Sequence, residues 1–339
     1  MQPKQGPTPS RRTTLRRALG TLAAAWVAAS APARLARSAV QPARLRVLCG
    51  APPGGIPDLI ARRYADALTP LFAGGTWVDN RPGAGGLLAI RQLMQSGPEA
   101  ATLLLAHGGI ATMYPALYTK LPYDPATDLA PVSIAAETAF GLAVGPGVPA
   151  SVQGASALLA QMRLDPALAN YGSPGPGTLP HVLGAMLTGA AGVAATHVPY
   201  AGGPPALVDL MGGRLAAMFL PEGLLRQHHA AGRLRVLAAT GADGARFMTE
   251  VPTFASQGLP AMMVSEWFAF FMPGPTPAAA VGEMAAAIHA AAASAALAAA
   301  MSDLAMRPAS STPSALIERI SAERGPWRAA IQSAGIRLQ

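Results

Sequence analysis

Four glycine-rich loops contain the residues best placed to do chemistry, because each loop follows a predicted strand and precedes a predicted helix. They span residues 50–58, 80–86, 172–178 and 199–205. In open α/β sheets, ligands bind beyond the carboxyl ends of the strands, and glycine lets the backbone approach a ligand closely. The helix after each loop offers unpaired N–H groups and the positive end of its dipole. Four such loops in equivalent positions predict an anion site built from backbone donors.

The loops do not match the phosphate-binding motifs of nucleotide sites. A dinucleotide-binding loop has the pattern G-x-G-x-x-G, and residues 83–88 and 175–180 both lack its last glycine. The pattern G-x-x-x-x-G-K-[ST] is also missing from the sequence. A small carboxylate therefore fits these loops better than a nucleotide does, although any one loop taken alone also fits a simple tight turn.

Enzymatic chemistry is poorly supported by the side chains. Ser173 stands in Y-G-S-P-G, which departs from the G-x-S-x-G pattern of a nucleophile elbow. Among the histidines, His181 is the one placed to touch a ligand, and it could equally pack or cap its helix. No H-E-x-x-H motif or zinc spacing occurs. We expect a binding protein without catalytic residues, metal or cofactor. The alternatives are a hydrolase that uses Ser173 and His181, and a receptor fold used only for signalling.

The first 39 residues have the layout of an export signal. Arg11 and Arg12 begin a basic segment that lacks Asp and Glu, and an apolar stretch follows at residues 18–31. That stretch is shorter than the ~20 residues of a membrane-spanning helix, so cleavage is favoured over anchoring, while the Tat and Sec routes stay open. This segment carries all but one unit of the net charge of +8. The mature chain is therefore nearly neutral, and nucleic acid is not an expected partner.

The elements that must position the loops alternate between strands and helices. Short apolar runs predict strands at residues 45–50, 76–79, 102–106, 132–136, 140–144, 168–171, 194–198, 215–220, 234–239 and 267–272. Helical periodicity predicts helices at residues 57–71, 86–95, 151–163, 179–188, 205–211, 221–231, 278–300 and 313–334. This alternation predicts the α/β class with mainly parallel sheets, arranged in two successive sets and hence two lobes.

Short motifs follow one another in a fixed order along the chain. They are G-G-I-P-D at 54–58, N-R-P-G-A-G-G at 80–86, L-P-Y-D-P at 121–125, S-P-G-P-G-T-L-P-H at 173–181 and H-V-P-Y-A-G at 197–202, followed by V-P-T at 251–253 and W-F at 267–268. Together they resemble the Bug/TctC family, the extracytoplasmic solute-binding receptors of tripartite tricarboxylate transporters. The ordered set spans nearly the whole chain after the signal, which makes the resemblance specific.

The resemblance implies a two-lobed periplasmic-binding-protein fold of type II-like topology, with mainly parallel sheets and a cleft between the lobes. The first lobe would comprise residues 44–140 and 266–339, and the second residues 141–265. The implied function is a monomeric periplasmic receptor whose signal is cleaved. It would capture a small carboxylated solute for a membrane permease or a sensor protein.

Loop chemistry and the resemblance agree on one site. Backbone amides of the first two loops would hold a carboxylate, and the second-lobe loops would close over the rest of the ligand. The predicted ligand-binding residues are Ala51, Gly54, Gly55, Asp58, Gly83, Ala84, Gly85, Ser173, Gly177, Thr178, His181, Tyr200 and Gly202. The chain departs from the family at Pro57, where Thr or Ser is frequent, and at Ala216 and Leu220, where acidic residues are usual. These departures weigh against a ligand whose amino group needs a carboxylate partner.

Overall fold

The structure is a computed structural model that describes residues 44–98, 101–241 and 246–339. The predicted export signal at residues 1–39 lies outside these residues. The first sheet has six strands in the order β11-β4-β10-β3-β1-β2. Its strands are β1 (Leu45–Cys49), β2 (Thr76–Asn80), β3 (Thr102–His107), β4 (Leu129–Thr138), β10 (Glu266–Pro273) and β11 (Arg307–Pro308).

The second sheet has five strands in the order β7-β6-β8-β5-β9. Its strands are β5 (Phe140–Val144), β6 (Asn170–Ser173), β7 (Thr196–Pro199), β8 (Ala217–Pro221) and β9 (Arg235–Ala239). The strands that precede the glycine loops pair in parallel: β1 with β2 and β3, and β6 with β7 and β8. Strands β10 and β5 run antiparallel to their neighbours. The α/β class is confirmed, and the antiparallel strands stand where the chain passes between the sheets.

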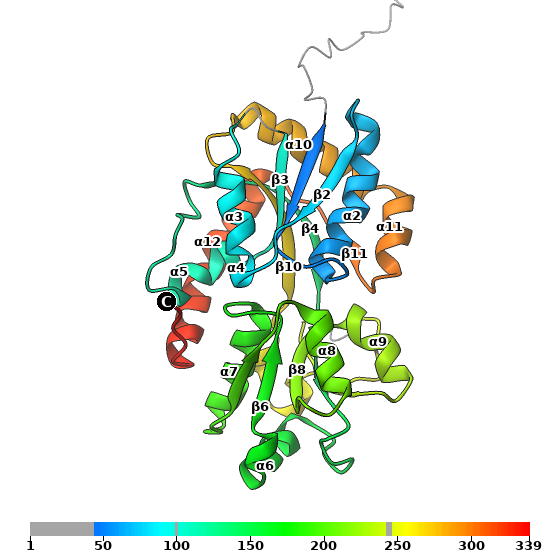
Figure 1. Cartoon of the computed structure of the whole chain (residues 1–339), viewed down its shortest axis with the longest axis vertical. Coiled ribbons are helices and arrows are strands. Elements are labelled where there is room, and N and C mark those ends of the chain that lie inside the picture. Colours follow the sequence, from blue (N-terminus) through cyan, green and yellow to red (C-terminus); the bar gives the residue numbers. More distant parts are fainter. Residues whose placement is uncertain (1–43, 99–100, 242–245) are drawn as a thin grey trace, which may run out of the picture. The chain divides into compact units, whose positions relative to one another are not determined.

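The chain passes between the two sheets at adjacent places. Strand β4 ends at Thr138 and β5 begins at Phe140, so a single residue, Ala139, connects the sheets. The chain returns at Glu266, the first residue of β10, which is the register partner of Thr138. In Figure 1, β4 runs towards the five-stranded sheet and β10 runs back alongside it into the six-stranded sheet.

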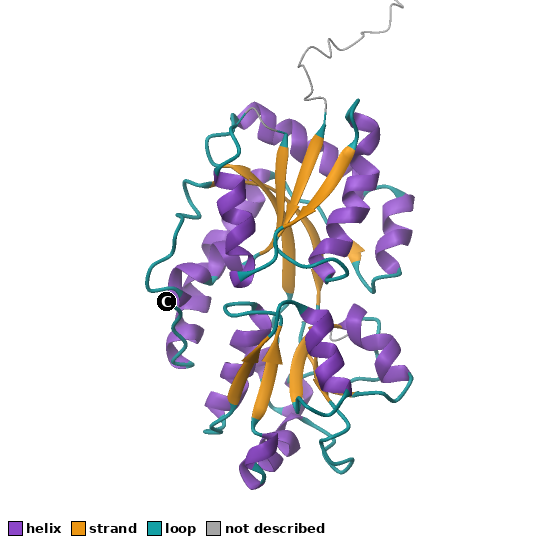
Figure 2. Ribbon diagram, viewed as in Figure 1, coloured by secondary structure: helices purple, strands orange, loops and turns teal. Residues whose placement is uncertain are grey.

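Helices cover both faces of each sheet (Figure 2). Around the first sheet these are α2 (Ile56–Leu68), α3 (Leu87–Met94), α4 (Gly109–Thr112), α5 (Tyr114–Leu117), α10 (Ala278–Ala292), α11 (Ala295–Ser302) and α12 (Pro313–Ser333). Around the second they are α6 (Ala155–Leu164), α7 (Leu179–Ala190), α8 (Gly203–Met211) and α9 (Glu222–Ala230). Side chains alternate between the two faces of a strand. In β1, Leu45 and Val47 accordingly pack in the cluster with α2 and α10, whereas Leu48 packs in the cluster with α3 and α12.

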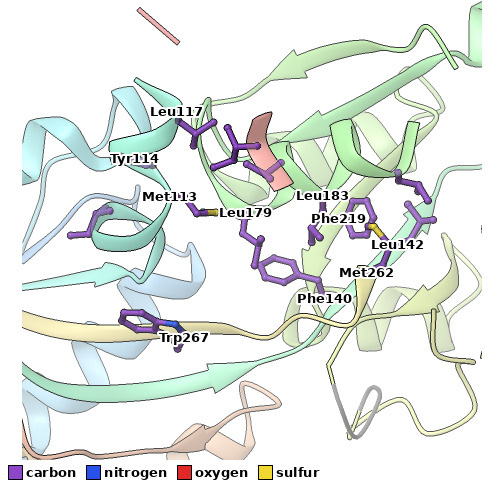
Figure 3. Close-up of a cluster of buried hydrophobic side chains, with 14 of the residues drawn as sticks. Met113, Tyr114, Leu117, Phe140, Leu142, Leu179, Leu183, Phe219, Met262 and Trp267 are labelled. Atoms are coloured by element: carbon purple, nitrogen blue, oxygen red, sulfur yellow. The ribbon is translucent and has the colours of Figure 1, made fainter. Parts of the chain in front are cut away.

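One hydrophobic cluster runs through both sheets (Figure 3). Met113 and Tyr114, from the α4–α5 segment, belong to it together with Leu179 and Leu183 of α7. Phe140 and Trp267, which stand near the two chain crossings, are also members. The two sheets are therefore joined by buried apolar side chains as well as by the two connecting strands.

The predicted helix at residues 278–300 is wrong as a single helix. It is two helices, α10 and α11, bent by 70°, and Ser294 caps the second by accepting a hydrogen bond from the Leu297 N–H at 3.2 Å. Alanine favours a helix throughout this segment, so composition hides the break, and the capping serine is its signal. Among the described residues no single helix has the length and apolar composition of a membrane span, and only α10 and α11 taken together meet those criteria.

The predicted strand at residues 168–171 begins later than expected, at Asn170. Residues 166–168 instead form a 3-10 turn, because the Asp165 carboxylate accepts a hydrogen bond from the Ala167 N–H at 3.0 Å. An Asp-Pro pair favours such a turn. The correction moves the strand towards Ser173, which places the third glycine loop directly at the strand's carboxyl end.

Candidate ligand-binding site

A cavity of about 330 Å³ lies between the loops of the two sheets. This is near the lower end of the roughly 300–1,000 Å³ found for small-molecule pockets. Its walls come mainly from the carboxyl ends of parallel strands and the helix starts that follow. The lining residues are 50–52, 56–57, 82–86, 104–107, 110, 140, 174–176, 178, 180, 200–203, 220–221, 224, 266 and 268.

The predicted site residues divide into two groups. Seven line the cavity: Ala51, Gly83, Ala84, Gly85, Thr178, Tyr200 and Gly202. The other six are not among its lining residues: Gly54, Gly55, Asp58, Ser173, Gly177 and His181. The structure thus brings residues of all four glycine loops together at one cavity.

Asp58 organises the first loop from a buried position. Its carboxylate accepts hydrogen bonds from the Gly54 N–H at 2.9 Å, the Arg62 guanidinium at 3.0 Å and the Asn80 amide at 2.8 Å. The same Asn80 amide donates to the Ala51 carbonyl at 3.0 Å. Burial alone would raise the pKa of Asp58, but these hydrogen bonds outweigh it and lower the pKa. Asp58 is therefore ionised and ties the first loop to the end of β2.

The second loop turns through left-handed backbone. Ala84, Gly85 and Gly86 have φ values of 47°, 63° and 96°. The Gly85 carbonyl accepts a hydrogen bond from the Tyr114 hydroxyl at 2.5 Å. The N–H groups of Ala84 and Gly85 make no hydrogen bond to any described residue. Successive N–H groups in such a turn form a concave anion-binding arrangement, so this loop keeps donors available beside the cavity.

A neutral cluster supports the third and fourth loops. The Ser173 hydroxyl lies 2.7 Å from Nε2 of His197 and accepts a hydrogen bond from the Gly175 N–H at 3.2 Å. The His197 ring stacks on that of His181, with centroids 3.8 Å apart. Nδ1 of His181 accepts from the Gly177 N–H at 3.1 Å. Burial lowers the pKa of both histidines to about 4, so both rings are neutral near pH 7.

The loops of one sheet touch those of the other across the cavity. A Cβ atom added at Gly202 would lie 2.6 Å from the Pro52 ring, and one added at Gly85 would lie 2.6 Å from the Pro176 carbonyl oxygen. Glycine is required at both places because any side chain would push the paired loops apart. The described structure therefore has the four loops closed around the cavity.

Backbone donors dominate the polar character of the site. Four helices, α2, α3, α7 and α8, begin at these loops, and in the described structure none of their N-termini has a side-chain cap. Thr178, at the start of α7, instead donates its hydroxyl to the Gly175 carbonyl at 2.7 Å. No Arg or Lys stands among the described residues that line the cavity. An anion would be held by N–H groups and helix dipoles rather than by a basic side chain.

Tyr200 contributes its ring to the wall while its hydroxyl is already bonded. The hydroxyl donates to the Asp209 carboxylate at 2.9 Å, and Asp209 also accepts from Arg214. Burial raises the pKa of Tyr200, as does its bond to Asp209. The phenol is therefore a fixed wall with little freedom to serve as a titrating group.

Two ionisable residues of the cavity wall, His107 and Glu266, were not predicted from the sequence. His107 ends β3, so the strand-end rule that selected the glycine loops could have found it. Glu266 begins the antiparallel strand β10, and no local signal marked it. Burial lowers the pKa of His107 to about 4 and raises that of Glu266 to about 8. Both side chains are mainly uncharged near pH 7, so the wall carries little net charge.

Within the residues that the structure describes, no group of three or more His, Cys, Asp or Glu side chains could hold a metal ion. The lining residues likewise contain no cluster of acid, base and nucleophile. Ser173 pairs with His197 rather than with His181, and its side chain is fully buried. The geometry is that of a binding pocket with preformed backbone donors.

A cavity between two α/β sheets, lined by glycine loops from both, is typical of solute-binding receptors. The chain matches the family described as "Tripartite tricarboxylate transporter family receptor" over residues 60–336. This range covers most of the chain, and the protein belongs to that family. The family membership predicted from the ordered motifs is confirmed.

Relatives and solved structures agree with this assignment. A UPF0065 protein of a Pseudomonas species, from the tcbD-tcbE intergenic region, is 31% identical over 278 residues, which cover 82% of each chain. A solved periplasmic transporter is 29% identical with a TM-score of 0.80, covering 87% of this chain and 98% of its own. An R. palustris protein solved with adipate is 27% identical with a TM-score of 0.81, covering 87% and 99%.

Proposed function

We propose that the protein is a periplasmic receptor that captures a small carboxylate without changing it chemically. The observation that carries this proposal is the cavity itself: four uncapped helix N-termini meet there, and the described lining residues include no Arg or Lys. Backbone amides bind a carboxylate well in such a setting, because they are fixed donors that need no countercharge. The R. palustris relative solved with adipate supports the same ligand class.

The proposal extends to the way the receptor works. The six-stranded sheet with its helices would form one lobe, residues 44–140 and 266–339, and the five-stranded sheet the other, residues 141–265. The two crossings beside Ala139 and Glu266 would act as the hinge, since a few residues at the ends of elements can absorb such a motion. The closed receptor, a monomer, would deliver its solute to a membrane permease of the tripartite type or to a sensor.

The proposal also includes the protein's location in the periplasm. A family of transporter receptors, together with a basic and apolar N-terminal segment, supports export to the periplasm with cleavage of that segment. The loop residues that we propose as ligand contacts are those that line the cavity: Ala51, Gly83, Ala84, Gly85, Thr178, Tyr200 and Gly202. The remaining six predicted residues would position these loops rather than touch the solute.

The experiment that tests the function is direct binding. Native mass spectrometry of the purified protein should reveal a co-purifying acid. Calorimetry after removal of that acid should then show one solute bound per chain among benzoate, adipate, citrate and glutamate. Incubation of the bound solute with the protein should return it unaltered. A new product whose formation stops in Ser173→Ala would instead support the hydrolase alternative, and failure of every carboxylate to bind would overturn the proposal.

A further inference from the structure

The buried carboxyl of Glu266 is out of place in a site for anions. The residue lines the cavity and is only 5% exposed. An ionised carboxylate there would repel a bound carboxylate, and burying an unpaired charge is costly. Since the described lining residues include no Arg or Lys, such a charge would have no ion-pair partner in the cavity wall.

Arg319, the cation whose charge acts on Glu266, is already paired with other carboxylates. Arg319 on α12 pairs with Glu323 at 2.8 Å and with Glu137 of β4. Glu323 also accepts hydrogen bonds from the Trp267 indole at 2.9 and 3.0 Å. Glu323 therefore lies near Glu266 as a second negative charge, which raises the pKa of Glu266 further, after burial as the main cause. Arg319 acts in the opposite direction and more weakly.

The other ionisable groups around Glu266 are neutral near pH 7. His107 on β3 is half-buried at the cavity wall, and burial lowers its pKa to about 4. Tyr114 on α5 donates its hydroxyl to the Gly85 carbonyl, and burial raises its pKa well above the ordinary range. Neither group supplies a positive charge. The groups that favour the ionised form of Glu266 are the N–H groups of Trp267 and Gly108 and the more distant charge of Arg319, and burial outweighs them.

Glu266 in its acid form has a hydrogen to donate. The N–H groups of Trp267 and Gly108 face its oxygens, and a protonated carboxyl adds an O–H donor. The other lining hydroxyls already donate within the protein, because Thr178 donates to Gly175 and Tyr200 donates to Asp209. Glu266 lines the cavity, so its acid form brings a carboxyl O–H donor to the wall that a solute would contact.

We propose that Glu266 contacts the solute in its acid form and donates a hydrogen bond to a solute oxygen, so that solute binding requires a proton on this residue. The inference rests on the proposed function, because it presumes that the cavity holds a carboxylate. It adds a specificity rule: the solute presents an oxygen acceptor at this wall, and an ammonium group is disfavoured there. Leu220, which also lines the cavity, is consistent with that rule because it offers no charge.

The test is calorimetry with adipate, or with whichever of benzoate, citrate and glutamate binds most tightly, from pH 6 to pH 9.5. Affinity should be constant below about pH 7.5 and should fall towards tenfold per pH unit above the pKa of Glu266. Buffers of different ionisation enthalpy should show proton uptake on binding at pH 9. Glu266→Gln keeps an N–H donor, so it should retain most of the affinity and lose the pH dependence.

Two further variants sharpen the test. Glu266→Leu keeps a similar volume but removes the donor, and it should weaken binding about tenfold or more at pH 6.5. Glu318→Gln makes the same substitution at an exposed position of α12, away from the lining residues, and should behave as wild type. Tighter binding with rising pH, or loss of binding in Glu266→Gln together with preference for glutamate, would overturn the inference in favour of an ionised Glu266 that pairs with an ammonium group.

A measurement without solute keeps the inference falsifiable if a variant binds poorly. The ordinary pKa of Glu is near 4.5 and that of Glu266 is about 8 in the folded chain. The folded state therefore holds a proton that the unfolded state has lost, and stability falls as pH rises between these values. In Glu266→Gln, the urea concentration at the unfolding midpoint should fall less than in wild type as pH rises over this range. Identical pH profiles of variant and wild type would refute a titrating Glu266.

The outcomes separate the two proposals. If none of the four carboxylates binds at any pH between 6 and 9.5, the proposed function falls and this inference falls with it. If a carboxylate binds with equal affinity across that range and Glu266→Gln changes nothing, the function stands and the inference alone is wrong.

Discussion

On the first sheet, the loop at residues 50–58 is held by an ionised network in which Asp58 meets Arg62, Asn80 and the Gly54 N–H. On the second sheet the corresponding task falls to neutral groups. There Ser173, His197 and His181 support the loop by a hydroxyl–imidazole hydrogen bond and a stacked pair of rings. The two sides of one cavity are thus built with different chemistry.

The difference shows how a site can fix an anion without a basic side chain. The Asp58 network lies behind the loop, so its charges are compensated before any solute arrives. The neutral histidines likewise add no charge on the opposite side. The field that a carboxylate meets in the cavity therefore comes from backbone amides and helix ends, and each side can be perturbed separately to test this division.

The largest expected effect comes from adding a side chain at Gly85, where a loop of the first sheet contacts a loop of the second. In Gly85→Ala the new Cβ would lie 2.6 Å from the Pro176 carbonyl oxygen and 2.4 Å from the Tyr114 hydroxyl. We expect a loss of solute affinity of about a hundredfold, since the loops of the two sheets could no longer meet; roughly 2.7 kcal/mol of binding free energy would be lost. Gly97→Ala, where nothing lies within 4 Å, is the matched control. Calorimetry that finds equal affinities for the two variants would show that the loops need not touch.

An intermediate effect on stability should distinguish the charged Asp58 network from the neutral Ser173–His197–His181 cluster. Asp58→Asn removes the ion pair with Arg62, whose side chain is 48% exposed, so we expect a loss of about 1–3 kcal/mol of unfolding free energy rather than the full cost of a buried pair. Ser173→Ala removes the neutral hydrogen bonds of this hydroxyl with His197 and Gly175 and should cost less, about 1–2 kcal/mol. Urea unfolding at pH 7 measures both. A larger loss in Ser173→Ala would reverse the comparison.

The smallest expected effect is a change in how much stability the protein loses at low pH. His181 and His197 have pKa values of about 4 in the folded chain against an ordinary 6.5. Their contribution to stability is complete above pH 6.5 and is lost as pH falls towards 4, because the unfolded chain then binds more protons. His181→Gln should remove part of this loss, on the order of 1–2 kcal/mol at pH 4.5. His289→Gln, at an exposed position, should not. The measurement is the melting temperature of each variant at pH 7 and at pH 4.5. If the two variants lose the same number of degrees between these pH values, the stacked pair has no role in acid sensitivity.

Much of the framework could be predicted from the sequence because its signals are local. The strand before each glycine loop, the helix after it and the order of the loops all follow from hydrophobic periodicity and turn residues. The bent pair α10 and α11 could not be separated by composition, since alanine predominates on both sides of Ser294. Short helices such as α4 and α5 were also missed, because four residues are too few to show a period.

The composition of the cavity wall was harder to predict, because it depends on contacts between distant residues. Glu266 reaches the cavity only through the antiparallel pairing of β10 with β3 and β4, which no pattern near residue 266 reveals. The partner of Ser173 is His197, which lies 24 positions away and is brought near by the parallel pairing of β6 with β7. His181 looked more suitable because it lies nearer in sequence. Local sequence patterns therefore predict where the loops lie, whereas the partners of their side chains depend on how the strands pair.

The pairing of Thr138 with Glu266 has a consequence for how this architecture can vary. The chain leaves the first sheet and returns to it at one register position, so residues 139–265 are an insertion at the tip of a hairpin whose arms are β4 and β10. The strand order of the first sheet is independent of what the insertion contains. The second half of the site can therefore be remodelled without altering that strand order, provided that the two ends of the insert stay adjacent and its loops still fit those of the first sheet.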